Sequence, residues 1–155
     1  MNITPPLERI KSTPDIDPSS DYDSLVMDLC ELLSTSDCQF AVGGFGQDCW
    51  PVDVSYDLST VIEQLPDVID SLRGGGDAEI DFYGQGVERR VSFLPLGDLI
   101  AIHCSSGTAW TPTPDSETAT MEEVTLLLSG LAHDFKVALE LAHPNLSGIT
   151  PFAAW

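Results

Sequence analysis

The chain has 155 residues, 43% of them hydrophobic, and a formal net charge of −19, because 25 Asp and Glu outnumber 6 Lys and Arg. This length and composition predict one folded domain with a hydrophobic core, and they argue against a disordered chain. The negative charge excludes bare nucleic acid and anionic membranes as favourable partners, because proteins bind both through Lys and Arg. A basic protein is the partner that this charge favours, since opposite fields speed association by roughly 10–10³-fold.

The negative charge is concentrated in the first half of the chain. Residues 12–72 contain thirteen Asp and Glu but no Lys or Arg, so we expect this half to present an anionic surface. Residues 1–14 lack the apolar stretch of a secretory signal, and apolar runs such as 99–102 are too short to cross a bilayer. We therefore expect a cytoplasmic protein that does not bind membranes.

Four prolines near the N-terminus predict a flexible arm over residues 1–19, followed by a single domain over residues 20–155. Leu and Val then recur at helical spacing, which predicts a first helix over residues 20–34. Ser20 and Asp23 resemble a capping box at the start of this helix. We expect no regular structure before it.

Two β-rich segments, 39–45 and 50–56, flank a glycine-rich stretch and predict a hairpin. Pro51 indicates that the second strand begins there or lies at an edge, because proline donates no ladder hydrogen bond. Apolar residues over 57–72 then return to helical spacing, and three consecutive glycines end this second helix. Pro66 predicts either a kink or a division into two short helices.

The second half of the chain predicts an antiparallel meander, a loop and a final helix. Apolar and polar residues alternate over 79–83 and 90–93, and 99–104 is a nearly continuous apolar run, so three strands are expected there, with a turn at 84–86. Residues 105–119 are rich in Ser, Thr and Pro and predict a long loop. Thr120 and Glu123 form a second capping box in front of the longest helix, which we expect to reach His143.

These elements predict an α+β fold, in which an antiparallel sheet of about five strands packs against two to three helices. The apolar C-terminal tail is expected to fold back on this single domain.

The sequence offers few candidates for catalysis or metal binding. Cys30, Cys38, Cys49 and Cys104 are dispersed without a Cys-x-x-Cys pair, so we expect reduced and mostly buried thiols. His103 and Cys104 would point to opposite faces of a strand, and the other two histidines lack the spacing of a metal site. We therefore expect no metal, no cofactor and no enzymatic activity.

Two acidic patches are candidates for partner binding. The first comprises Asp77, Glu79, Asp81 and Tyr83, with Trp110 expected beside it. The second comprises Asp53, Asp57, Asp67 and Asp70, and Trp50 is a further aromatic candidate. Like charges on one face repel one another, so folding alone gives no reason for such clusters. A solvated face, a divalent-metal site and a contact surface for a cationic protein are the three interpretations, and the neighbouring Trp and Tyr favour the last, because they often anchor interfaces.

Three features of the chain carry a resemblance to a family of bacterial proteins. They are a Trp-Pro strand opening at 50–54, acidic meander segments at 79–83, 91–95 and 98–102, and a closing helix with the segments 144–146 and 152–155. In these features, over about residues 38–155, the chain resembles the small acidic immunity proteins that bacteria encode beside polymorphic secreted toxins. The resemblance implies a stand-alone cytosolic α+β domain that binds one toxin domain and blocks its active site. By analogy, the toxin would be a deaminase or a nuclease, which binds nucleic acid and is therefore basic.

The sequence thus favours a non-enzymatic inhibitor that covers the basic active-site cleft of a cognate toxin domain, with the first acidic patch as the contact. One alternative is a chaperone or adaptor for a secreted effector, which would bind a catalytically dead and an unfolded effector alike. The second alternative is a small cysteine- or carboxylate-dependent enzyme, whose turnover Cys104→Ala would abolish.

Overall fold

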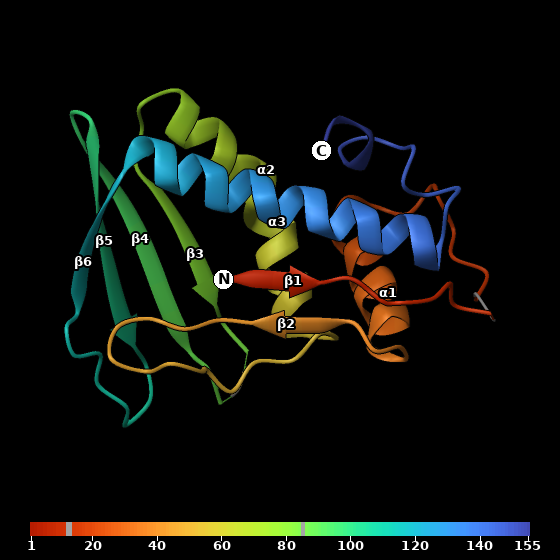
Figure 1. Cartoon of the computed structure of the whole chain (residues 1–155), viewed down its shortest axis with the longest axis horizontal. Helices are drawn as coiled ribbons and strands as arrows, with labels where there is room; N and C mark the ends of the chain where they lie inside the picture. The colour runs from red at the N-terminus through yellow and green to blue at the C-terminus, as the bar shows by residue number, and fades with distance from the viewer. Residues whose placement is uncertain (12–13, 85) are drawn as a thin grey trace.

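The computed structural model describes residues 1–11, 14–84 and 86–155, which form the predicted α+β fold (Figure 1). Its strands are β1 (Asn2–Thr4), β2 (Gln39–Ala41), β3 (Ala78–Phe82), β4 (Arg89–Leu96), β5 (Leu99–Ser106) and β6 (Ser116–Thr120). Its helices are α1 (Tyr22–Ser34), α2 (Asp57–Arg73) and α3 (Met121–Ala142), with a short 3-10 helix, η1 (Phe152–Ala154), near the C-terminus. β1 and β2 form a small antiparallel sheet, and the main sheet has the order β3-β4-β5-β6. Among the described residues, no helix combines the length and the apolar character needed to cross a bilayer.

The main sheet is the predicted meander with one more strand. β3, β4 and β5 are antiparallel neighbours, and their register places Ile80 opposite Val91. Gly97 turns the chain between β4 and β5 with a φ of 67°, a conformation that favours glycine. The turn predicted at 84–86 includes Gln85, which lies outside the described residues.

The fourth strand, β6, lies where the sequence predicts a loop over residues 105–119, so that prediction is wrong for residues 116–119, and residues 105–106 belong to β5. β6 pairs with β5 and places Glu117 opposite Ile102. Its sequence, SETAT, has a single apolar residue, and no hydrophobic alternation indicates a strand. The connection between β5 and β6 is therefore residues 107–115.

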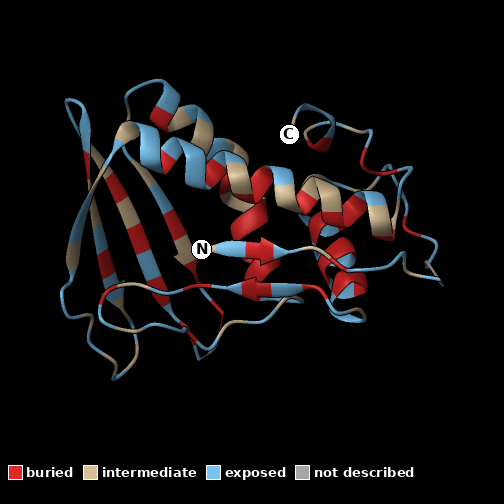
Figure 2. Cartoon of the chain, in the orientation of Figure 1, coloured by how far each residue is buried: buried red, intermediate tan, exposed pale blue. Residues whose placement is uncertain are grey.

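The two faces of the main sheet differ in burial (Figure 2). The inner face packs against the helices, and its buried residues are Ile80, Phe82, Val91, Phe93, Ile100 and Cys104. The outer face carries the alternate residues Glu79, Asp81, Arg90, Ser92 and His103, which are exposed or half-buried. Because successive strand residues point to opposite faces, the register assigns every side chain of the meander to one face or the other.

Two helices have caps that satisfy backbone N–H groups of their first turn. α3 begins with the predicted capping box, in which Thr120 Oγ1 accepts from the Glu123 N–H and the Glu123 carboxylate accepts from the Thr120 N–H. α1 is capped by Asp21, whose carboxylate accepts from a first-turn N–H at 3.1 Å. The predicted box of Ser20 and Asp23 is therefore wrong, because Asp21 supplies the acceptor one position later.

α2 continues as one helix through Pro66. A proline has no N–H, so it cannot donate to the carbonyl four residues earlier, which belongs to Ile62. Tyr22 of α1 replaces that bond, because its hydroxyl donates to the Ile62 carbonyl oxygen at 2.8 Å. Burial raises the pKa of the Tyr22 hydroxyl, so it remains a donor at neutral pH. Of the two predicted outcomes at Pro66, the division into two helices does not occur.

The N-terminal segment contains a strand that the sequence does not predict. β1 pairs with β2 and places Ile3 opposite Phe40, and Ile3 is 3% exposed. The predicted hairpin partner of β2, at 50–56, is wrong, because β2 ends at Ala41 and residues 50–56 form no strand but lead into α2. Residues 12 and 13 of the predicted arm lie outside the described residues.

The C-terminal tail packs against α1 and α3, as predicted. Phe152 of η1 is fully buried, and its ring centroid lies 5.8 Å from that of Phe135 and 5.9 Å from that of Tyr22. Trp155 lies against both Phe135 and Phe152. Lys136 Nζ donates to two carbonyl oxygens of the tail, both at 3.0 Å. These contacts join the two ends of the domain to the same aromatic cluster.

Candidate acidic binding site

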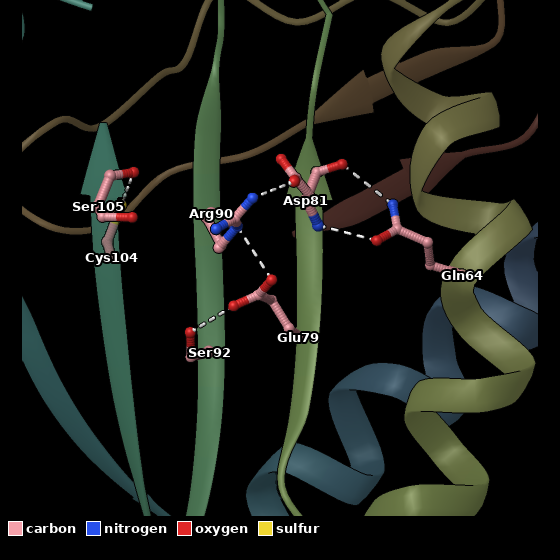
Figure 3. A network of polar contacts seen from close by, with 7 residues as sticks. All are labelled: Gln64, Glu79, Asp81, Arg90, Ser92, Cys104 and Ser105. Carbon is pink, nitrogen blue, oxygen red and sulfur yellow. Dashed lines mark hydrogen bonds and ion pairs between the residues drawn. The ribbon is translucent and has the colours of Figure 1, made fainter. Parts of the chain in front are cut away.

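α2 runs along the outer edge of β3, and one side chain joins the two elements. Gln64 accepts a hydrogen bond from the Asp81 N–H at 2.9 Å and donates to the Asp81 carbonyl oxygen at 3.0 Å (Figure 3). Its amide makes the two bonds that a neighbouring strand would make to this edge. The polar side of α2 and the acidic strand β3 therefore form one continuous surface.

A shallow groove of about 310 Å³ lies between α2 and β3. We call it the acidic groove, and its lining residues are Gln64, Asp67, Val68, Ser71, Asp77, Ala78 and Glu79. Asp67 and Asp77 are exposed, and the Ser71 hydroxyl donates to the Asp77 carbonyl oxygen at 2.7 Å. The groove unites members of both predicted patches, since Asp77 and Glu79 belong to the first and Asp67 to the second. Carboxylates arranged in this way suit Lys and Arg side chains of a partner.

One cation lies beside the acidic strand, on the outer face. Arg90 of β4 pairs with Glu79 at 2.9 Å and with Asp81 at 2.7 Å (Figure 3). The hydrogen bond to Asp81 raises the pKa of the Arg90 guanidinium. Arg90 thus relieves the like-charge crowding at Glu79 and Asp81, whereas no described residue forms an ion pair with Asp67 or Asp77.

An exposed aromatic pair lies just past the end of β3. The rings of Tyr56 and Tyr83 meet edge to face at 6.3 Å between centroids, and their exposed fractions are 49% and 53%. The Tyr83 hydroxyl donates to the Glu63 carboxylate at 2.9 Å, and burial raises the pKa of Glu63. Tyr56 and Glu63 are not among the predicted site residues. Their link to Tyr83 joins segments far apart in the chain, so no local pattern could have indicated it.

Trp110 lies against the inner face of the sheet, so its predicted position beside the acidic strand is wrong. Its ring stacks on Arg89, whose Cζ lies 3.6 Å from the Trp110 centroid and 4.3 Å from the Trp50 centroid. Arg89 is opposite Phe82 on the inner face, whereas the next residue, Arg90, is on the outer face. Trp50 is 2% exposed, so its side chain belongs to the core and does not reach the surface.

Arg89 is a buried cation, with 4% of its surface exposed. Its Nη2 donates to Gln47 Oε1 at 2.8 Å, whereas Nε and Nη1 have no hydrogen-bond partner among the described residues. Burial lowers the pKa of the guanidinium, but an arginine remains protonated in proteins. The two indole faces stabilise this charge and so hold the loops of Trp50 and Trp110 on the sheet.

The remaining members of the second predicted patch have different surroundings. Asp57 is 5% exposed, and its carboxylate accepts from the Asp53 N–H at 2.8 Å, so it does not contribute to the surface. Burial raises the pKa of Asp57. Asp53 is exposed, and its carboxylate accepts from the Tyr56 N–H at 2.7 Å, which fixes the turn before α2. Asp70 is exposed and lies 3.8 Å from Arg73 on the same helix.

No protein-family model, curated protein or solved structure matches this chain. The resemblance to immunity proteins therefore stays a prediction.

Three of the four cysteines are buried in the described structure. All four are free thiols, and only Cys49 is exposed. Cys104 is buried on the inner face and His103 is exposed on the outer face, as their alternation predicts. Burial raises the pKa of Cys104, and it raises the pKa of Cys38 to about 11, so both are protonated at neutral pH. Among the described residues, no three His, Cys, Asp or Glu side chains are placed to hold a metal ion.

Proposed function

We propose that this chain is an immunity protein, a non-enzymatic inhibitor that binds a basic secreted toxin domain and covers its active-site cleft. The acidic groove is the observation that carries the proposal. Asp67 and Asp77 lie in it without an ion-pair partner among the described residues, in a chain with a net charge of −19. Such a groove is complementary to the Lys and Arg residues that line the cleft of an enzyme acting on nucleic acid.

In this proposal, the charge and the aromatic pair have different tasks. The negative field increases the rate of encounter with a basic domain and orients it, an effect that salt weakens. Tyr56 and Tyr83 then supply rigid, half-exposed rings, of the type that dominates binding energy at interfaces. Their loss should mainly accelerate dissociation. Substrate is excluded because the bound inhibitor occupies the cleft.

The test uses the toxin domain of a secreted protein encoded beside this chain. Co-expression should protect cells from that domain, and purified protein should inhibit its activity at a one-to-one ratio. Asp67→Lys combined with Asp77→Lys should reduce the association rate at least tenfold at low salt. Tyr83→Ala should leave association nearly unchanged and increase the dissociation rate, as expected for an interface anchor.

The matched control is Asp28→Lys combined with Asp48→Lys, because both residues are exposed and lie outside the acidic groove. Each Asp→Lys change adds two positive charges, so both pairs move the net charge from −19 to −15. An equal loss of association rate in both pairs would show that total charge matters and that the groove does not. A toxin domain that is neither bound nor inhibited would refute the immunity function itself.

An adaptor for a secreted effector is the second candidate, and one apolar groove favours it. This groove, of about 370 Å³, lies between α2 and α3 and is lined mainly by Ile69, Leu72, Met121 and Leu128. An adaptor would use such a groove to bind an apolar helix of its client. It would bind an inactive and an unfolded effector equally well and would not inhibit the active one, so the stoichiometric inhibition assay separates the two candidates.

A further inference from the structure

A second, apolar pocket lies on the inner face of the main sheet, away from the acidic groove. It has a volume of about 240 Å³ and is lined by residues of the sheet and of α3, by the chain that follows β2 and by Met1. Phe93 and Ile102 line it from the sheet, Phe45 and Trp50 from the chain after β2, and Val124 from α3. We call it the inner-face pocket.

The inner-face pocket leaves apolar residues of the sheet incompletely covered. Phe93, Ile102 and Glu117 lie in one cross-strand row, so their side chains share the inner face. Ile102 is only half-buried, although the neighbouring Phe93 is 3% exposed. Leu127 of α3, at the pocket, is 37% exposed. Inner-face positions normally gain from complete burial, so this uncovered apolar area is available to a ligand.

Two carboxylates line the same pocket. Glu117 Oε1 accepts from the Phe45 N–H at 2.8 Å, and Glu123 Oε2 accepts from the Thr120 N–H and hydroxyl. Among the described residues, the second oxygen of each carboxylate has no hydrogen-bond partner. The hydrogen bonds from Thr120 lower the pKa of Glu123, so it is ionised at neutral pH. Both glutamates are exposed, so the pocket combines an apolar interior with negative charge open to solvent.

We propose that the inner-face pocket binds an aromatic side chain of the basic partner, with a neighbouring Lys or Arg of the same segment paired to Glu117 and Glu123. The proposal rests on the proposed function for the existence of that partner. The aromatic walls formed by Phe45, Trp50 and Phe93 favour an aromatic ring. The volume is below the ~300–1,000 Å³ of pockets for small molecules, which favours a single side chain. The carboxylates select a flanking cation, because an acidic segment would be repelled.

The test uses three blocked tripeptides, Lys-Trp-Lys, Lys-Ala-Lys and Glu-Trp-Glu, titrated into methyl-labelled protein and followed by NMR. Lys-Trp-Lys should shift the methyl signals of Ala119, Val124 and Leu127, which line the pocket. Lys-Ala-Lys should leave them unchanged, and Glu-Trp-Glu should bind at least tenfold more weakly. Glu117→Gln with Glu123→Gln keeps the hydrogen-bond acceptors and should reduce the affinity for Lys-Trp-Lys about tenfold.

Ala119→Leu fills the pocket and should abolish binding of Lys-Trp-Lys. Its control is Ala101→Leu, the same change on the outer face of β5, which should leave binding intact. Equal binding of all three peptides, or shifts confined to the outer face or the acidic groove, would overturn the proposal. Tryptamine binding as tightly as Lys-Trp-Lys would also overturn it, because a small organic cation would then be the better ligand.

The pocket proposal and the immunity function can fail separately. If the Ala119→Leu variant binds the toxin domain with wild-type affinity, the pocket is not part of the interface, but the inhibitor function is unaffected. Conversely, if Lys-Trp-Lys binds in the pocket but the protein inhibits no toxin domain, the ligand preference of the pocket is supported and the immunity function is refuted.

Discussion

The hydrogen bond from Tyr22 to the Ile62 carbonyl is expected to be the contact that allows a proline inside α2. Tyr22→Phe removes only the hydroxyl, and the ring keeps its place against Phe152 at 5.9 Å between centroids. Ile62 is fully buried, so its carbonyl oxygen would lose its partner where water does not reach. The Ile62 carbonyl depends on Tyr22 because Pro66 has no N–H, whereas any other residue at position 66 would donate its own N–H to the same oxygen.

The expected magnitude follows from that geometry. An unsatisfied buried acceptor costs about 1–3 kcal/mol, so Tyr22→Phe should destabilise the protein by this amount. For a domain of this size, each kcal/mol lowers the melting temperature by about 2–4 °C. In a Pro66→Ala background, the new N–H can reach the Ile62 carbonyl, and Tyr22→Phe should then cost under about 0.5 kcal/mol. The coupling between the two positions is therefore expected to be about 0.5–3 kcal/mol.

The assay is a double-mutant cycle measured by urea unfolding. The effect of Pro66→Ala on its own cancels in the cycle, so the helix propensity of alanine does not influence the result. If Tyr22→Phe lowers the free energy of unfolding equally in the wild-type and Pro66→Ala backgrounds, the reasoning is refuted, since the hydroxyl then stabilises the protein independently of the missing N–H.

Two further predictions concern single residues near the acidic groove. Burial raises the folded-state pKa of Asp57 above its ordinary value of 3.8, so the native protein loses stability as pH rises through that pKa. Asp57→Asn should therefore be more stable than wild type at pH 7. Urea unfolding should show that this difference vanishes below about pH 3. A constant difference at all pH values would contradict this assignment. Gln64→Leu removes both hydrogen bonds to Asp81, so it should lower the free energy of unfolding by about 1–3 kcal/mol and speed hydrogen exchange of the Asp81 amide. Gln64→Glu keeps the acceptor and should retain protection of that amide. Unchanged exchange in Gln64→Leu would show that other contacts protect the edge of β3.

The parts of the fold that could be predicted from the sequence are those with a local signal. Alternating apolar residues such as Ile80 and Phe82 predict the meander, and the Thr120 capping box predicts where α3 begins. β1 and β2 have three residues each and pair across a long stretch of chain, so no local pattern reveals them. β6 is polar, and pairing with β5 alone makes it a strand.

The candidate site divides in the same way. The acidic residues were visible in the sequence, but the groove exists because Gln64 brings α2 to β3, a contact that depends on tertiary structure. Arg90 lies opposite Asp81 and diagonal to Glu79, and only the register shows that these residues meet. The position of Trp110 could not be predicted in this way, because the alternation of Val91 and Phe93 assigns Arg89 to the inner face but does not show that Trp110 stacks on it.

Two of the three tryptophans in this chain share the single cation of Arg89. Trp50 and Trp110 belong to two loops that are joined by the hydrogen bond from the Thr113 N–H to the Phe45 carbonyl oxygen at 2.9 Å, and their ring centroids lie 6.1 Å apart. Their fluorescence is consequently a built-in optical signal for the docking of these loops. Trp50 also forms a wall of the inner-face pocket, so the same emission could follow occupation of that pocket without any attached dye.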